Sequence, residues 1–189
     1  MFLFAKPSKT VIETFLLAAQ EMEFSYIGIG ATETTVPNGY LLDHNLIEIG
    51  ESDAQWDAAK RSISTWRMFD IGWVNIYGPT TPIETGQAVA IVIRHLGFYS
   101  LNAARIVYTI DEPARFGFAY GTLEDHGESG EERFMVERDS EGKIWYDLKA
   151  FSRPDHIFSK IGYPVVRMLQ KRFARDSKQA MFRAVNAIG

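Results

Sequence analysis

The sequence contains no cysteine. This absence excludes a disulfide framework, a thiolate nucleophile, a zinc–thiolate site and an iron–sulfur cluster. Long hydrophobic runs are missing too, since no apolar stretch approaches the ~20 residues that span a bilayer. The apolar start at residues 1–5 ends at once in Lys6 and Pro7, which makes it too short for the core of a signal peptide. The sequence therefore predicts a cytoplasmic protein without stable membrane insertion.

An excess of charge of one sign is also lacking. Among 189 residues, 20 lysines and arginines stand against 24 aspartates and glutamates, which leaves a net charge of −4. That balance argues against nucleic acid or an anionic membrane as a partner. The 46% hydrophobic and 13% aromatic content is ample for a packed core. Because no segment repeats, is low in complexity or has the composition of a linker, we expect residues 1–189 to form a single domain.

Several motifs that define enzyme classes are missing. Gly28-x-Gly30 lacks the third glycine and the helix start of a dinucleotide-binding loop, and no Walker-type Gly-Lys-Ser/Thr occurs. The histidines form no His-x-x-x-His or His-Glu-x-x-His pair, and no serine lies in a Gly-x-Ser-x-Gly elbow. The acidic hairpin at 124–132 matches no calcium-loop template and is expected to be a solvated turn. We therefore expect no metal and no cofactor.

Two short helices are expected in the N-terminal third. Ser8 has the position of an N-cap before an apolar stripe at helical spacing, which predicts a helix ending near residues 20–21. Ser52 opens a capping box, and the apolar spacing that follows predicts a second helix over residues 53–67. Between the two helices, residues 40–49 have the pattern of a strand.

Beyond residue 70 the hydrophobic periodicity changes from that of helices to that of strands. Six strands separated by turn signals are predicted at 71–77, 87–95, 105–110, 116–123, 132–138 and 143–151. Their short connections disfavour the helical crossovers of a parallel sheet and favour an antiparallel meander. Pro164 then starts a long final helix to about residue 187. We predict an α+β fold in which a curved antiparallel sheet grips a long C-terminal helix.

Three blocks of sequence resemble those of a known family. They are RFGFAYGTL at 115–123, GEERF at 130–134 and AFSRP at 150–154, and the segments 66–73 and 43–45 also fit the pattern. The family is the one known as domain of unknown function 1990. The resemblance implies a fold similar to the START and birch-pollen-allergen (SRPBCC) superfamily, whose members enclose an apolar cavity between the sheet and the last helix. It implies no activity. In the common arrangement two helices follow the first strand together, whereas here the strand at 40–49 lies between the two predicted helices.

The strand at 115–123 is the most informative segment for function. Its alternation places Phe116, Phe118 and Tyr120 on one face, and leaves a bare stripe on the other face, formed by Gly117, Ala119 and Gly121. A bare stripe requires a close neighbour. Either the long helix packs tightly on it, or it is the floor of a ligand site with Trp73 and Trp145 as walls.

The leading functional hypothesis is the binding of a small hydrophobic or amphipathic molecule in the cavity. Its lining is predicted to come from Trp73, Phe116, Phe118, Tyr120, Trp145 and Phe151, with Gly121 in the floor. Because Phe116, Phe118 and Tyr120 share one face, not all six side chains can point inward. Arg153 lies where the sheet leads to the final helix, and its guanidinium is placed to close one end of the cavity or to bind a ligand carboxylate.

The rival hypothesis is an enzyme of the cyclase or hydrolase kind that acts on a bound carbonyl compound. Tyr120, His44 or Glu132 would then transfer the proton. His44 follows Asp43, but adjacent strand residues face opposite sides, which favours an ordinary, satisfied histidine. A third possibility is a protein-interaction module with a filled core. A cavity would separate the binder from the module, and a strongly perturbed titratable group in that cavity would favour the enzyme.

Overall fold

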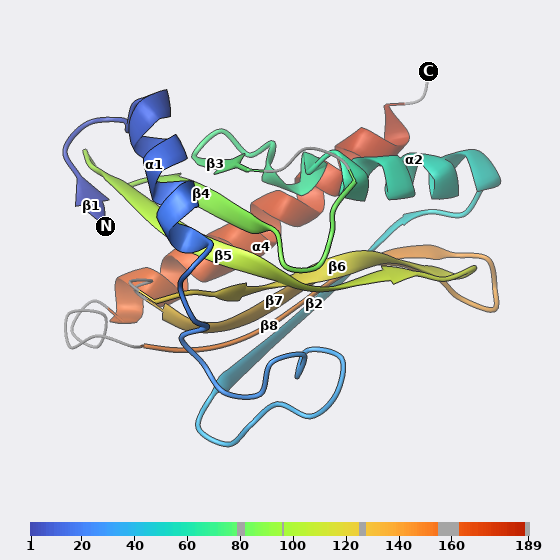
Figure 1. Ribbon diagram of the computed structural model, residues 1–189. Coiled ribbons are helices and arrows are strands. Elements are labelled where there is room, and N and C mark those ends of the chain that lie inside the picture. Colours follow the sequence, from blue (N-terminus) through green and yellow to red (C-terminus); the bar gives the residue numbers. More distant parts are fainter. Residues whose placement is uncertain (79–81, 96, 125–127, 155–162, 188–189) are drawn as a thin grey trace.

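The computed structural model describes residues 1–78, 82–95, 97–124, 128–154 and 163–187 (Figure 1). The chain begins with β1 (Phe2–Leu3), α1 (Lys9–Ala19), β2 (Leu41–Gly50), α2 (Asp53–Ser64) and the 3₁₀ helix η1 (Arg67–Phe69). Six strands follow: β3 (Val74–Tyr77), β4 (Ala88–Arg94), β5 (Tyr99–Asp111), β6 (Arg115–Thr122), β7 (Glu128–Arg138) and β8 (Ile144–Pro154). The long helix α4 (Tyr163–Asn186) closes the chain.

All strand pairs of the sheet are antiparallel. Seven strands lie in the order β2-β8-β7-β6-β5-β4-β3, and the short β1 pairs with β5 outside this path. The chain from β3 to β8 is a meander, in which each strand pairs with the next. This confirms the predicted α+β fold, with a curved sheet around a long C-terminal helix.

The two faces of the sheet are covered by different parts of the chain. The inner face packs against α2, η1 and α4 in the largest hydrophobic cluster, which includes Phe118, Phe134 and Met181. The outer face packs against α1, which places Ile12 beside Leu101. Figure 1 shows α1 and α4 on opposite sides of β4 and β5. A site between sheet and α4 is therefore separated from α1 by the full thickness of the sheet.

Capping explains where the two shorter helices begin. The Ser8 hydroxyl accepts a hydrogen bond from the backbone of Val11, and Ser52 and Gln55 form a complete capping box. The predicted helix at 53–67 is wrong at its end, because α2 stops at Ser64. Trp66 then adopts a left-handed conformation with φ of 60°, and η1 follows as a separate short helix.

Several strands are longer or shorter than predicted. β5 begins at Tyr99 and β7 at Glu128, earlier than the predicted starts at residues 105 and 132, whereas β3 begins only at Val74. The early part of β7 consists of Glu128, Ser129 and Gly130, residues whose polar character does not indicate a strand. The predicted acidic turn lies partly outside the described residues, which omit 125–127.

The N-terminal segment accounts for the unusual position of the strand at 40–49. When counting starts at β2, the chain runs strand, α2, η1, six strands and long helix. This is the order that the resemblance implies, and residues 1–40 are an addition in front of it. The addition lies along the outer face, where Tyr26 and Ala31 pack on Phe151 of β8.

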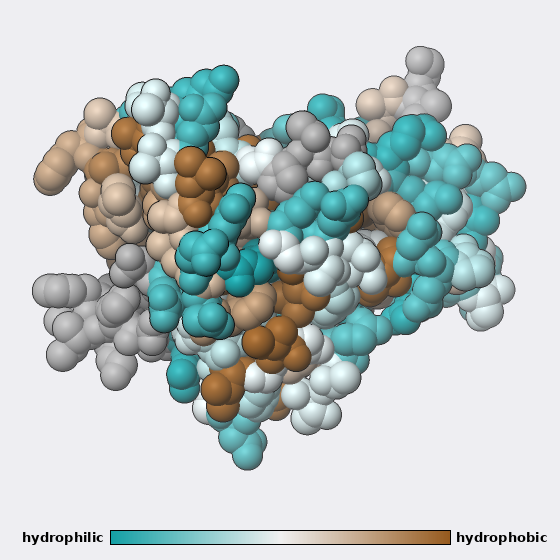
Figure 2. Space-filling view, viewed as in Figure 1, coloured by the Kyte–Doolittle hydropathy of each residue, from teal (hydrophilic) through white to brown (hydrophobic). Residues whose placement is uncertain are grey.

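The surface in Figure 2 shows hydrophobic side chains over the segment that connects α1 to β2, in the lower part of the view. Ile27 and Ile29 of this segment are exposed. Among the described helices, none combines the length and the apolar character that a membrane span requires.

Candidate functional site

A cavity of about 640 Å³ lies between the inner face of the sheet and α4. Its apolar walls come from η1, from the strands and from one side of α4. They include Phe69, Trp73, Val74, Ile91, Ile93, Leu148, Val166, Leu169, Phe173 and Ala174. The walls are formed because inward-facing residues of each strand alternate with outward ones, while α4 offers residues at helical spacing.

The register of the sheet places polar residues in one row across this cavity. Tyr120 pairs with Glu132, Glu132 pairs with Ala150, and Ala150 pairs with Asp43 of β2. In an antiparallel sheet, directly paired residues point to the same face. The row therefore presents a phenol and two carboxyl groups to the cavity, from the consecutive strands β6 and β7 and from the distant strand β2.

Glu132 is the central polar group of this row. Its Oε2 accepts a hydrogen bond of 2.8 Å from the Tyr120 hydroxyl, while Oε1 accepts none from any residue that the structure describes. Burial raises the pKa of Glu132 from 4.5 to about 7, and the charges of Glu128 and Asp43 act in the same direction. Burial also raises the pKa of Tyr120. Glu132 can therefore hold or release a proton near neutral pH.

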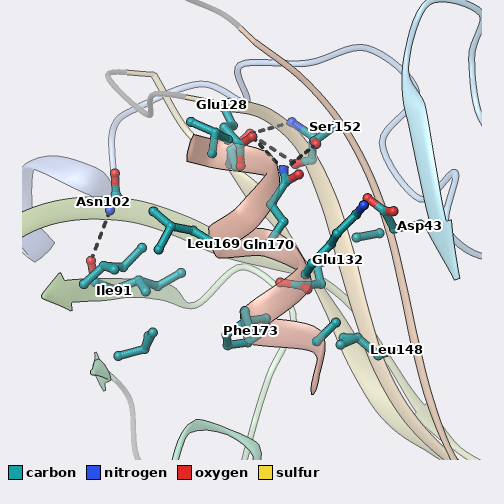
Figure 3. Close-up of a pocket in the computed structure, with 18 of the residues that line it drawn as sticks. Asp43, Ile91, Asn102, Glu128, Glu132, Leu148, Ser152, Leu169, Gln170 and Phe173 are labelled. Atoms are coloured by element: carbon teal, nitrogen blue, oxygen red, sulfur yellow. Dashed lines mark hydrogen bonds between the residues drawn. The ribbon is translucent and has the colours of Figure 1, made fainter. Parts of the chain in front are cut away.

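A second polar group lies near the N-terminal end of α4 (Figure 3). The Gln170 side-chain amide donates to Glu128 at 2.6 Å and to the Ser152 hydroxyl at 3.0 Å. Burial raises the pKa of Glu128 as well. Nearby, Arg167 donates from its two terminal nitrogens to both carboxylate oxygens of Asp43, one of them at 2.8 Å. These contacts tie α4 to β2, β7 and β8.

The far side of the cavity, toward β4 and β5, is also polar. Asn102 donates to the Ser100 hydroxyl at 3.1 Å, and His95 Nε2 lies 2.8 Å from the same hydroxyl. Burial lowers the pKa of His95. Among the described residues, no group of three His, Asp or Glu side chains could hold a metal ion.

The raised pKa of Glu132 makes the stability of the folded protein depend on pH. The folded protein keeps the proton of Glu132 up to about pH 7, whereas the unfolded chain loses it near 4.5. The free energy of unfolding therefore contains a favourable contribution that is complete below pH 4.5 and is lost as the pH rises through 7. The cavity admits solvent to this half-buried side chain, which screens its charge and reduces the effect. We expect the free energy of unfolding to fall by about 2 kcal/mol over this pH range.

Urea unfolding at about pH 5 and about pH 8 checks this expectation. The difference in unfolding free energy between the Glu132→Gln variant and the wild type should grow in favour of the variant as the pH rises, because glutamine has no proton to lose. A constant difference over this range would contradict the assignment of the raised pKa to Glu132.

Comparison with known proteins identifies the family. The family model described as "Domain of unknown function (DUF1990)" matches residues 25–180. The chain belongs to the DUF1990 family. A UPF0548 protein of Dictyostelium discoideum is 34% identical over 99% of this chain and 97% of its own length. A UPF0548 protein of Deinococcus radiodurans is 34% identical over 97% of this chain and 98% of its own.

Solved structures share the fold of this DUF1990 protein at low sequence identity. A hypothetical protein from Helicobacter pylori has a TM-score of 0.57 at 8% identity, with 87% of this chain and 98% of that chain covered. A norcoclaurine synthase point mutant from Thalictrum, in complex with a transition state analogue, has a TM-score of 0.55 at 14% identity and covers 80% and 97%. The structure of Ara h 8.0201 has a TM-score of 0.51 at 11% identity and covers 76% and 98%. These likenesses confirm the helix-grip fold that the sequence blocks imply.

Some of the predicted site residues of the DUF1990 chain do meet at the cavity. Trp73, Tyr120 and Glu132 line it. The indole of Trp73 donates to Asp176 of α4 at 3.0 Å, which fixes one wall to the helix. Phe116 and Phe118 lie on the same inner face but belong to the packed core, where Phe118 contacts Trp66 and Phe134.

Other predicted residues lie on the outer face instead. Trp145 donates its indole hydrogen to Asp139 at 2.8 Å and is outward by alternation with the buried Tyr146. The ring of Phe151 packs between Tyr26 and Tyr40. Arg153 is exposed, and its guanidinium lies 4.8 Å from the centre of the Tyr40 ring. The prediction that Arg153 closes one end of the cavity is wrong for this reason.

The bare stripe also lies on the outer face. A Cβ added at Gly121 would collide with the ring and hydroxyl of Tyr26, from the N-terminal addition. Tyr26 occupies the space that was expected to hold the long helix or a ligand, so both predictions for Gly121 are wrong. Gly121 lacks a side chain because a tyrosine from a segment nearly a hundred residues earlier needs the space, whereas a Cβ at Gly117 would meet Phe134 and Met135 of β7.

His44 pairs with a different carboxylate from the one beside it in the sequence. Its Nε2 lies 3.1 Å from Asp147, which also accepts a hydrogen bond of 2.9 Å from Arg133. Asp43 points to the other face, toward Arg167, as strand alternation requires. This ionic cluster lies on the outer face, separate from Tyr120 and Glu132.

Glu128, Gln170 and Asp43 are members of the site that the sequence patterns do not predict. A signal for Glu128 was present, because residues 128 and 132 share one face of a strand that includes both. Gln170 interrupts the apolar stripe of the last helix beside Leu169 and Phe173, and such a polar residue on a buried face needs a partner. The pairing of β2 with β8, which brings Asp43 to the site, has no local signal.

Proposed function

We propose that this protein binds a small amphipathic molecule in the cavity between the sheet and α4. The observation that carries the proposal is an apolar cavity of about 640 Å³ with the Tyr120–Glu132 pair in its wall. Ligand sites typically have a volume of about 300–1,000 Å³, mostly apolar walls and a few convergent polar groups. An apolar body would lie against Leu148, Leu169 and Phe173, and a polar end would meet Glu132.

The same cavity supports a binder over an interaction module with a filled core. Protein interiors are close-packed, and voids much larger than a water molecule are rare in them. A space of this size between the sheet and the helix therefore supports the binding of a small molecule there. The norcoclaurine synthase of similar fold was solved with a transition state analogue, so the helix-grip scaffold is able to hold a small molecule.

Filling the cavity with protein atoms provides the first test. Ala174 of α4 lines the cavity, and Ala174→Trp should reduce the binding of the neutral fluorescent probe Nile red at least about tenfold, because the indole occupies the ligand's volume. Ala54→Trp is the matched control, since Ala54 is an exposed alanine of another helix, α2. Thermal unfolding would show that both variants are folded.

Native mass spectrometry of the purified protein, followed by organic extraction, would identify a compound that co-purifies. A stoichiometric apolar compound would support the proposal. An apo mass together with Nile red binding that Ala174→Trp does not weaken would reject it.

Proton transfer on a bound carbonyl compound is the second candidate function. The specific observation in its favour is Glu132, whose pKa of about 7 and contact with Tyr120 suit general acid–base chemistry. The extracted compound, once returned to the apo protein, distinguishes the two functions. Conversion to a new product that depends on Glu132 would favour the enzyme, and an unchanged compound would favour the binder.

A further inference from the structure

The charged groups around the cavity are divided by sign. The most buried ones are the carboxyl groups of Glu132 and Glu128, whereas Asp43 is partly exposed and paired with Arg167 of α4. The cations of α4 that border the cavity are Lys171 and Arg175, both exposed, and Lys178, whose ammonium lies 3.4 Å from the Asn45 side chain. We propose that the ligand carries a basic amine, and that its ammonium group binds the free oxygen of Glu132. This inference rests on the proposed function and names the class of its ligand.

The hydrogen bonding of Glu132 points to a donor from the ligand. Tyr120 holds Oε2 at 2.8 Å and so sets the orientation of the carboxyl group. Oε1 receives no hydrogen bond from the described residues. Glu132 is half-buried and lies beside the cavity. A carboxylate in such a place favours a charged donor, because charge-assisted hydrogen bonds are the strong ones.

The groups that face Glu132 from the neighbouring elements leave its charge uncompensated. They are Tyr120 on β6, Glu128 on β7 and Asp43 on β2. The Tyr120 hydrogen bond favours the charged form, and both carboxylates oppose it. Arg167 of α4 is directed to Asp43 and Gln170. None of the described cations forms an ion pair with Glu132, so a ligand cation would supply the missing charge.

The apolar walls define the rest of the molecule. Phe173 of α4 and Leu148 of β8 lie beside Glu132 at the cavity (Figure 3). An alkyl or aryl group attached to the amine would cover these walls while the ammonium reaches the carboxylate. An anionic head group at the same place would meet the carboxyl groups of Glu132 and Glu128, which disfavours fatty acids and phosphate esters there.

Three ligands of equal chain length test the inference: octylamine, octanol and octanoate. Each would be used to displace Nile red from the wild-type protein at about pH 8, where the amine is charged and Glu132 is ionised. We expect octylamine to bind about tenfold more tightly than octanol, and octanoate to bind the least, since hydrogen bonds to charged groups contribute more than neutral ones. Equal or weaker binding of octylamine relative to octanol would overturn the inference and leave the proposed function intact. Failure of all three to displace the probe would reject both.

Variants and pH assign the preference to one residue. Glu132→Gln should abolish the advantage of octylamine over octanol. Glu137→Gln, which removes a carboxylate of the same strand on the other face, should keep the advantage. Because Glu132 has a pKa of about 7, the affinity for octylamine should be about tenfold lower at pH 6 than at pH 8, and that for octanol should not change. An advantage that survives in Glu132→Gln would contradict the assignment.

Discussion

Replacement of Glu131 by alanine is expected to lower the free energy of unfolding by about 4 kcal/mol. Glu131 lies next to Glu132 but points to the outer face, where only 3% of it is exposed. Its Oε2 accepts hydrogen bonds of 2.7 Å from the Tyr26 hydroxyl and from the backbone of Gly30. Its Oε1 accepts one of 2.9 Å from the backbone of Thr32 and another from the Thr32 hydroxyl.

These contacts make Glu131 the main polar link between the sheet and the N-terminal addition. Without the carboxylate, two backbone N–H groups and two hydroxyl groups lose their acceptor in a buried place, and each unsatisfied donor destabilises the folded state. The energetic effect is large because the segment at 26–32 has little regular structure of its own and depends on these contacts.

Chemical denaturation and limited proteolysis would measure the effect. Glu131→Ala should unfold at lower denaturant concentration and should be cut in the segment between α1 and β2 before the rest of the protein unfolds. Glu21→Ala removes an exposed carboxylate from the same part of the chain and should change the free energy of unfolding by less than about 0.5 kcal/mol. If both variants have equal stability, Glu131 does not anchor the segment.

The alternation of side chains along the strands could be predicted from the sequence, but not which face is inside. Alternation correctly places Phe118 and Tyr120 on one face and Gly117 and Gly121 on the other. Both faces of this sheet are covered, one by α4 and the other by the N-terminal addition, so hydrophobicity on one face and small residues on the other do not identify the cavity side. Only Tyr26, distant in sequence, explains the small residue at position 121.

The candidate site depends on the register between paired strands, and this limits what the sequence predicts. Tyr120 and Glu132 were each candidates for proton transfer, yet their contact arises from the register of β6 against β7. That register is set by where the two strands of the hairpin begin and end. β7 begins at Glu128, a residue type with weak strand propensity, so its start has no clear signal in the sequence. The partner of His44 could not be predicted either, because Asp147 lies on β8 and reaches His44 only through the pairing of β2 with β8.

Gly121→Val is the second substitution with a large expected effect. If Gly121 formed the floor of a ligand site, as the sequence suggests, a valine at this position would abolish ligand binding. The structure leads to a different expectation, because the valine side chain would meet Tyr26 on the outer face. We expect a loss of about 3 kcal/mol in the free energy of unfolding from overpacking, with Nile red binding unchanged in the folded protein.

A double-mutant cycle tests the physical cause of this loss. Tyr26→Ala alone should destabilise the protein, since it removes a buried ring and its hydrogen bond of 2.7 Å to Glu131. In the double variant the alanine leaves room for the valine, so the loss should be smaller than the sum of the two single losses by at least about 1 kcal/mol. Additive losses would show that the collision with Tyr26 is not the cause. Reduced Nile red binding in Gly121→Val alone would contradict the expectation that the outer face is independent of the cavity. The substitution on the outer face of β6 would then alter the cavity through the sheet.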